Sequence, residues 1–258
     1  MHLCLLLYLG HEFPNIHRRL SNDEWFTELF NLIDHQDEKV ESISIALLSE
    51  LFPYDELSYA ILESIPDNLL NRLCFLIHFN HYEDNGKSNA ALTLLLKIHG
   101  QFIKKRGSIR TKVLDVLLHQ SLLSHRKEIS LSIIHHFNRS GKLLKIYRLD
   151  DTNVQNSTID LLHTIIQRDA EYFYTNDINV LFDVTLREVM RINDSNEQLR
   201  HQYMKLLPKL IHSIPAGSPG ACKTLKTQMK DKLTKISSSP LSTTSTCLLA
   251  QRILNEID

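Results

Sequence analysis

The sequence predicts an all-α fold in which successive helices stack into a helical-repeat solenoid. Apolar residues recur every three or four positions along nearly the whole chain, and this spacing places them on one face of a helix. Only 7 glycines and 7 prolines occur among 258 residues, and the prolines mostly fall where a predicted helix ends. No run of alternating apolar and polar residues bounded by turns indicates a strand.

The first half of the chain divides into helices separated by recognisable breaks. Apolar periodicity predicts helices over residues 25–33, 40–51, 57–62, 69–77 and 90–102. Pro53 and Pro66 end two of them, because proline lacks the amide hydrogen that an inner helical turn requires. Asn85-Gly86 indicates a turn, and Gly107 closes the helix before it as a C-terminal cap.

The second half continues the same pattern. Periodicity predicts helices over residues 113–118, 129–137, 143–149, 159–166, 178–189, 199–207, 225–236 and 247–254. Loops rich in Pro, Gly and Ser are expected at 215–220 and 237–240. Helix groups recur about 40 residues apart, which is the period of armadillo and HEAT repeats. We therefore expect one armadillo-like helical domain over residues 1–258.

The start of the chain is apolar but short. Residues 3–9 (LCLLLYL) fall far below the roughly 20 apolar residues that span a bilayer. They also lack the basic leader and the small-residue cleavage site of a signal peptide, so we expect a packed helix. A terminal repeat needs a polar outer face, which this run does not offer. Either neighbouring helices cover it, or the chain begins inside a longer parent.

Composition limits the classes of partner. The chain has 29 basic and 30 acidic residues, so no overall field attracts nucleic acid or an anionic membrane. We expect no nucleic-acid binding and no membrane insertion. The four cysteines are widely scattered within helical patterns, which is typical of reduced thiols in a cytoplasmic protein.

No motif for catalysis or cofactor binding is present. The 14 histidines include none in a His-Glu-x-x-His motif, and no paired cysteines accompany them, so no metal site is expected. A glycine-rich phosphate loop and a Gly-x-Ser-x-Gly elbow are both absent from the sequence. We therefore expect a protein that is not an enzyme and that carries no cofactor.

Residues 171–189 combine an aromatic cluster, a helix start and a strongly periodic helix. Thr175, Asn176 and Asp177 are residue types that cap the start of a helix. The residues Tyr172, Phe173 and Tyr174 precede them, where an aromatic ring can pack on the next turn. The apolar positions of the helix, expected to be buried, are Ile178, Leu181, Phe182, Leu186 and Val189.

This segment carries a family resemblance. The sequence of this part of the chain resembles the core of the Dip and Ldb group of fungal actin-patch proteins. The residues that carry the resemblance are Tyr174-Thr-Asn-Asp177, the apolar helix after them, and then Leu199-Arg200 and Tyr203. That group is related to the armadillo domain of the Nck-interacting SH3 adaptor. The specific part of this resemblance covers about residues 170–208.

The resemblance implies a function. Members of this group activate the actin-related protein 2/3 complex without a preformed filament, and so nucleate linear actin filaments at cortical and endocytic actin patches in the cytoplasm. The resemblance also implies that further helices precede the first residue. The alternative is a generic armadillo or HEAT-type scaffold that binds a peptide or a helical partner and has no effect on actin.

Three groups of residues are candidates for the partner-binding surface. The polar face of the helix at 178–189 offers its outward side chains, and Asp183 with Arg187 is spaced to form a helix-stabilising ion pair. The basic residues gather at one helix end and along a second helix, where they would dock on an acidic surface or simply answer a helix dipole. The candidates are Asn179, Asp183, Arg187, Lys104, Lys105, Arg106, Lys226 and Lys230.

Overall fold

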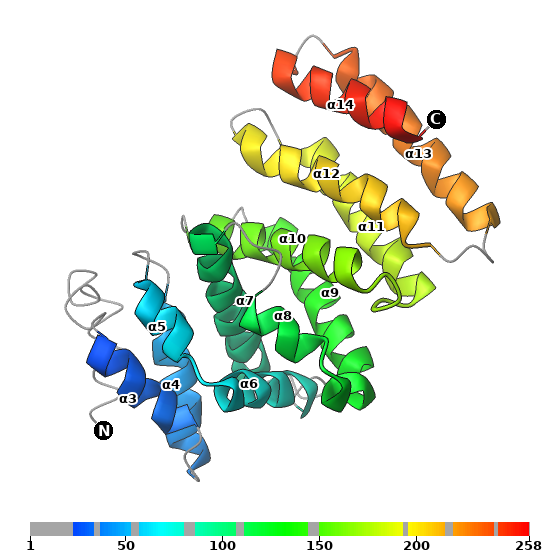
Figure 1. The fold of residues 1–258 in the computed structure, drawn as a ribbon. Helices are drawn as coiled ribbons and strands as arrows, with labels where there is room; N and C mark the ends of the chain where they lie inside the picture. Colours follow the sequence, from blue (N-terminus) through cyan, green and yellow to red (C-terminus); the bar gives the residue numbers. More distant parts are fainter. Residues whose placement is uncertain are drawn as a thin grey trace. The chain divides into compact units, whose positions relative to one another are not determined.

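The computed structural model of this chain is all-α in the part that it describes (Figure 1). The described residues are 23–33, 37–52, 57–79, 86–106, 111–143, 150–192, 196–214, 219–239 and 242–257. Within these ranges there is no strand, which confirms the predicted fold class. The apolar run at 3–9 and the cap at Gly107 lie outside the described residues.

The chain forms two compact units, which we describe separately. The first consists of Met1–Ile133 and Leu149–Ser157, and the second of Ile134–Arg148 and Thr158–Asp258. The boundary therefore falls inside two helices, α9 (Arg126–Leu143) and α10 (Asp150–Arg168). The expectation of a single domain stays a prediction.

The first unit is built from helices that pack around the long helix α7. Its elements before α9 are α3 (Asp23–Ile33), α4 (Glu38–Leu51), α5 (Tyr59–Ser64), α6 (Asp67–Phe79), α7 (Gly86–Arg106), α8 (Lys112–Leu117) and the 3-10 helix η1 (Gln120–His125). Helix α7 packs against α4, α5, α6 and α8. Leu48, Leu70, Leu95 and Leu114 are completely buried between these helices. Burial of such apolar faces is what stabilises stacked helical repeats.

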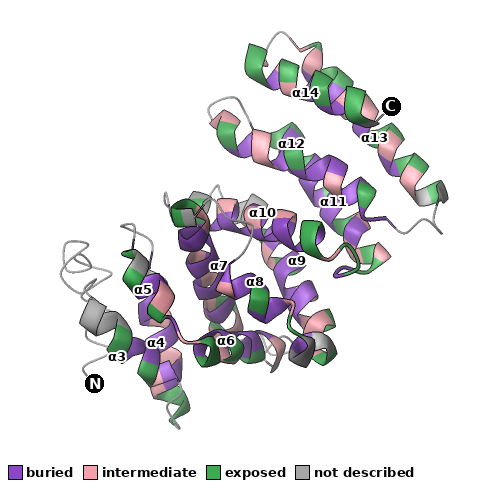
Figure 2. Ribbon diagram, viewed as in Figure 1, coloured by how far each residue is buried: buried purple, intermediate pink, exposed green. Residues whose placement is uncertain are grey.

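The second unit continues in the same way. After the shared helices come α11 (Thr175–Arg191), α12 (Glu197–His212), α13 (Pro219–Ser237) and α14 (Thr244–Ile257). Helices α11 and α12 pack together, as do α13 and α14, and α12 contacts α14. Buried residues run along one side of these helices and exposed residues along the other (Figure 2). Helix α13 begins with Pro219 and Gly220, so the predicted loop at 215–220 does not include these two residues. Residues 215–218 lie outside the described ranges, and there the loop stays a prediction.

Side-chain hydrogen bonds join helices that lie about 30 to 50 residues apart in the sequence. Lys97 donates to the backbone of Ser49, 48 residues earlier, and Arg187 donates to Asn138, 49 residues earlier. The Lys112 ammonium donates to the carbonyl oxygen of Glu63 at the end of α5, again 49 residues earlier. Other bonds span fewer residues, such as 31 from Arg72 to Glu41 and 44 from Leu57 to Gln101. Each helix group therefore bonds to the group before it along the chain, which agrees with the predicted helical-repeat solenoid.

Candidate interaction surface

Helix α11 begins at Thr175, earlier than a cap at Thr175, Asn176 or Asp177 would place it. Tyr174 is the N-cap residue, with extended backbone angles. Its amide donates to Asp177 Oδ2 at 3.2 Å, so Asp177 closes the first turn from inside the helix. Tyr172 and Phe173 are buried edge to face, with ring centroids 5.0 Å apart. The expectation that the aromatic residues before the helix pack on its next turn was wrong for Tyr174, which is 58% exposed.

The two faces of α11 follow the predicted pattern. All five apolar positions predicted to be buried are buried: Ile178, Leu181, Phe182, Leu186 and Val189. The opposite stripe recurs every three or four residues and is exposed; we call it the α11 outer face, and it consists of Asn176, Val180, Asp183, Arg187 and Met190. Asn179 lies at its edge and is only half-exposed. Val180 and Met190 are 44% and 42% exposed, so this face is partly apolar.

Arg187 holds α11 to α9 as well as facing outward. Its Nη1 donates to Asn138 Oδ1 at 3.0 Å, and its Nη2 donates to the Asn138 carbonyl oxygen at 3.4 Å. Its Nε donates to the buried carboxylate of Glu188 at 3.0 Å. These bonds use the guanidinium, and no ion pair joins Asp183 to Arg187 among the described residues, so the predicted Asp183–Arg187 pair is wrong. Because it carries these bonds, Arg187 is a structural residue that is also accessible.

The basic cluster at the end of α7 is partly exposed. Lys104 and Lys105 are exposed on the last turn, while the side chain of Arg106 lies outside the described residues. Nearby Lys112 is used within the fold, since its Nζ donates to the carbonyl oxygens of Glu63 at 2.6 Å and Ile65 at 3.1 Å. It therefore satisfies carbonyls at the end of α5, which have no partner within that helix.

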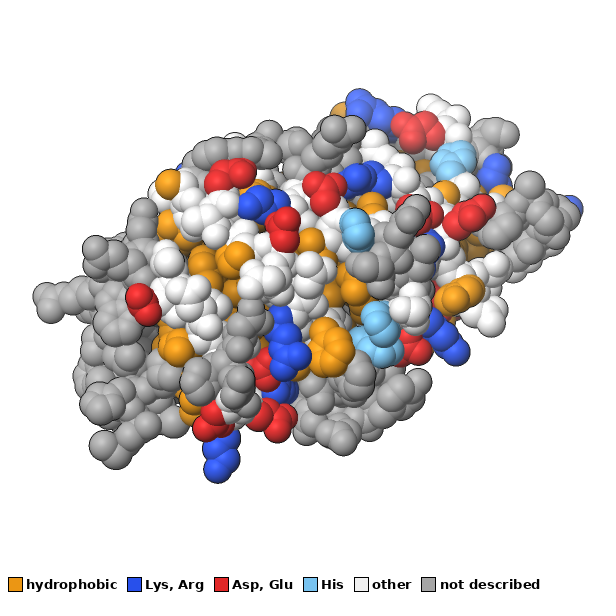
Figure 3. All heavy atoms as spheres, turned by 60° about the horizontal axis from the view of Figure 1, so that its bottom comes forward, with side chains coloured by type: hydrophobic (Ala, Val, Ile, Leu, Met, Phe, Trp, Pro, Cys, Tyr) orange, Lys and Arg blue, Asp and Glu red, His pale blue; other side chains and the backbone are white. Residues whose placement is uncertain are grey.

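The second basic cluster lies along α13. Lys226 and Lys230 are one turn apart and half-buried. Lys235 is bonded to Asp231 at 2.9 Å, which offsets part of the positive charge. On the face of the molecule in Figure 3, basic and acidic side chains are likewise interspersed. Binding guided by charge must therefore be local.

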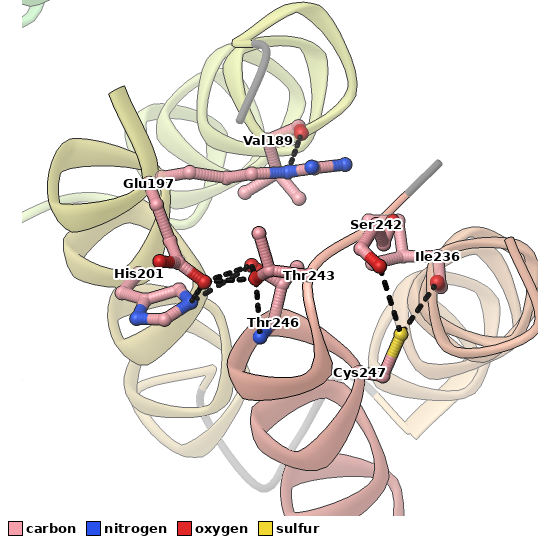
Figure 4. A network of polar contacts seen from close by, with 9 residues as sticks. Val189, Glu197, His201, Ile236, Ser242, Thr243, Thr246 and Cys247 are labelled. Carbon is pink, nitrogen blue, oxygen red and sulfur yellow. Dashed lines mark hydrogen bonds and ion pairs between the residues drawn. The ribbon is translucent and has the colours of Figure 1, made fainter. Parts of the chain in front are cut away.

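A polar network joining α12 to α14 was not predicted from the sequence (Figure 4). Glu197 Oε1 accepts hydrogen bonds from the hydroxyls of Thr243 and Thr246, and His201 Nε2 lies 2.9 Å from Thr246 Oγ1. Thr243 directly precedes α14. Its hydroxyl oxygen also accepts a hydrogen bond from the Thr246 amide at 3.2 Å, as the side chain of an N-cap residue does. The bond from Thr243 lowers the pKa of Glu197, and burial lowers the pKa of His201. Only the Glu197–His201 spacing of four residues could have indicated this site.

Neither a metal centre nor a membrane span is found among the described residues. No three histidine, cysteine or carboxylate side chains in these ranges are grouped so that they could hold a metal ion. No described helix is both long enough and apolar enough to cross a bilayer.

Solved structures resemble this chain only distantly. An engineered protein matches with a TM-score of 0.43 at 16% identity, covering 92% of this chain and 97% of that protein. A HEAT-like repeats protein from Thermococcus onnurineus matches with a TM-score of 0.38 at 14% identity, covering all of this chain and 97% of that one.

Curated fungal proteins give closer sequence similarity. Protein dip1 of Schizosaccharomyces pombe is 41% identical over 150 residues, which cover 55% of this chain and 37% of dip1. Protein LDB17 of Eremothecium gossypii is 23% identical over 214 residues, which cover 79% of this chain and 44% of that protein. Protein LDB17 of Saccharomyces cerevisiae is 25% identical over 198 residues, which cover 74% of this chain and 38% of that protein. The chain thus matches less than half the length of these relatives.

A family model matches the middle of the chain. The model of the SPIN90/Ldb17 leucine-rich domain matches residues 84–220, a span that contains all of α7 to α12. The matched span is more than half of the 258 residues and includes the segment around α11 on which the resemblance rests. This chain therefore belongs to the SPIN90/Ldb17 leucine-rich domain family.

Proposed function

We propose that this chain binds the actin-related protein 2/3 complex and activates it without a preformed filament, so that linear actin filaments start at cortical and endocytic actin patches. Membership of the SPIN90/Ldb17 leucine-rich domain family is the observation that carries this proposal. The matched span, residues 84–220, includes the α11 outer face and the basic end of α7. Since the chain covers less than half of its relatives, the activity of this chain by itself is part of the proposal.

Activation without a filament is a population shift. The chain must bind the active arrangement of the complex more tightly than the inactive one, and the difference in binding free energy is the largest shift that it can cause. Moving an equilibrium from 1:99 to 99:1 requires a difference of about 5.5 kcal/mol. Side chains fixed on packed helices suit this task, because a surface that does not yield cannot fit both arrangements equally well.

The α11 outer face is our proposed contact surface. It places the exposed apolar side chains of Val180 and Met190 beside Arg187, and methionine and arginine are both enriched in protein interfaces. Asp183 lies between them and Asn179 at the edge. The basic residues Lys104, Lys105, Arg106, Lys226 and Lys230 would add local attraction to an acidic surface of the complex.

The first experiment measures actin assembly with purified complex and without seed filaments. With this chain present, the lag before assembly should shorten and the filaments seen by microscopy should be unbranched. Assembly no faster than with the complex alone would refute activation by this chain. If the chain then still bound the complex in a pull-down, the scaffold alternative would explain the result.

The second experiment tests the contact surface with a matched pair of variants. Asp183→Lys changes the charge at the centre of the α11 outer face, where the carboxylate is exposed. Glu256→Lys makes the same charge change on the exposed side of α14, in the same compact unit. We expect D183K to weaken binding to the complex and E256K to leave it unchanged, with equal helix content by circular dichroism. Equal binding by both variants would exclude this face as the contact surface.

A further inference from the structure

The accessible side of α12, in the second unit, is basic. Lys205 and His212 are exposed, and Lys209 lies half-exposed between them in the sequence. Their spacings of four and three residues place the three side chains on one side of the helix. We call these three residues the α12 basic stripe. From Lys205 to His212 a helical rise of about 1.5 Å per residue gives the stripe a length of about 10 Å.

No carboxylate neutralises this stripe among the described residues. Lys205 and Lys209 form no hydrogen bond and no ion pair there. Glu197 is the one acidic residue of α12, and it lies at the opposite end of the helix. Its carboxylate already accepts hydrogen bonds from the Thr243 and Thr246 hydroxyls (Figure 4). The two ammonium charges are therefore available to a ligand.

His163 on α10 shows that the two ammonium groups act on the same place. Burial and, after it, the charges of Lys209 and Lys205 lower the pKa of His163 to about 4. Both lysines therefore lie near this half-buried imidazole, which is uncharged at neutral pH. Burial raises the pKa of Asp160, one turn earlier on α10, to about 6. An adjacent cation would lower that pKa instead, so Asp160 is not the partner of the lysines.

The dipole of α12 explains only part of the stripe. Cations in the last turn of a helix interact favourably with its free carbonyl groups, and Lys209 and His212 lie in the last turn of α12. Lys205 lies one turn earlier, where this effect has faded. Like charges four residues apart destabilise a helix, so placing Lys205 beside Lys209 is unfavourable for folding alone. The same placement is favourable for holding an anion.

The size and composition of the stripe distinguish between anionic partners. Anionic membranes are bound through clusters of about 4–8 lysine or arginine residues, and the stripe contains only Lys205 and Lys209. Single-stranded nucleic acid stacks on aromatic side chains beside the cations, whereas Tyr203 of α12 is completely buried. An extended peptide covers about 10 Å in about three residues. The stripe therefore fits a short peptide segment that carries carboxylates.

We propose that the α12 basic stripe docks an acidic segment of a protein partner, rich in aspartate or glutamate. Lys205 and Lys209 supply the charge, and the imidazoles of His163 and His212 supply further polar groups beside them. The stripe shares no residue with the α11 outer face or with the other residues assigned above to the contact with the actin-related protein 2/3 complex. The proposal does not rest on activation of that complex, because the chain alone should bind the acidic segment.

The test titrates an oligoaspartate peptide into the isotopically labelled full chain at low ionic strength, with an oligoasparagine peptide as the uncharged control. NMR follows the imidazole resonances of His163 and His212. We expect saturable shifts with oligoaspartate only. Because bound carboxylates favour the charged imidazole, the measured pKa of His163 should rise in the complex. No saturable shift would overturn the proposal, and a complex in which the His163 pKa does not rise would place the peptide elsewhere.

A matched pair of charge reversals tests the stripe itself. Lys205→Glu changes an exposed position, so the helix content by circular dichroism should stay the same. The peptide should bind about tenfold more weakly, because repulsion replaces attraction at a surface site. Lys223→Glu makes the same charge change at an exposed position of α13 in the same unit, and should weaken binding by no more than about twofold. Equal weakening by K205E and K223E, or tighter binding of a single-stranded oligonucleotide than of oligoaspartate, would overturn the proposal.

Discussion

Replacing Arg187 with alanine should destabilise the second unit although the side chain is 41% exposed. The substitution removes the two bonds to Asn138 and the bond to the Glu188 carboxylate. A hydrogen bond to a charged group contributes about 1.5–3 kcal/mol when it is shielded from water. Solvent screening reduces this contribution, and Glu188 keeps Arg191 at 2.6 Å, so we expect a loss of about 1–2 kcal/mol in the free energy of unfolding.

Urea unfolding followed by circular dichroism measures this loss. Asp183→Ala is the control, since it lies on the same outer face and should change the free energy of unfolding by less than about 0.5 kcal/mol. Arg187→Lys should fall between them, because lysine keeps the charge but cannot bond Asn138 and Glu188 at once. If Arg187→Ala and Asp183→Ala unfolded at the same urea concentration, the bonds from Arg187 would not contribute to stability. A loss of partner binding in R187A is thus ambiguous, whereas Asp183 reports on the surface alone.

Three further predictions concern stability. Phe182→Ala should cost about 3–5 kcal/mol in urea unfolding, because the ring is completely buried; a cost below 1 kcal/mol would contradict its place in the core. Gly100→Ala should lower the melting temperature, because the added methyl group meets the Ser157 hydroxyl and lies 3.2 Å from Ser157 Cβ; a stabilised variant would mean that the hydroxyl rotates away and that the gain in helix propensity exceeds the remaining clash. Burial lowers the pKa of His99 to about 4. Between pH 6.5 and 4 the imidazole therefore binds a proton in the unfolded chain but not in the folded chain. Stability should therefore fall as the pH drops from 6.5 toward 4, with His99 contributing about 1.4 kcal/mol per pH unit, and His99→Gln should show a shallower slope.

Local patterns in the sequence predicted the helices and the buried side of α11. Phe182 and Leu186 are recognised as core residues because their neighbours three and four positions away already define the face. The same three- and four-residue spacing predicted that Asp183 lies on the opposite, exposed face. The family could also be recognised locally, since the motif at 174–177 lies within a few residues of the helix that it starts.

The partners of polar side chains could not be predicted, because they come from distant positions. Arg187 has an acid four residues before it, yet it bonds an asparagine 49 residues away in α9. Glu41 is 1% exposed although an acidic residue in a helix normally indicates a solvated face, and it is paired with Arg72 at 2.6 Å and Lys87 at 2.7 Å. Such burial becomes understandable only once three helices are placed around the carboxylate. The close approach of α7 and α10 at Gly100 likewise has no sequence motif.

The side-chain bonds between helix groups have a consequence for changes in chain length. Lys97, Lys112 and Arg187 each donate to a residue in an earlier helix group. Loss or gain of a complete helix group leaves the faces of the other helices as they are, whereas a change of a few residues within a helix rotates every later side chain of that helix by about 100 degrees per residue. Members of this family should therefore differ in length by complete helix groups or within connecting loops, and seldom by small insertions inside helices.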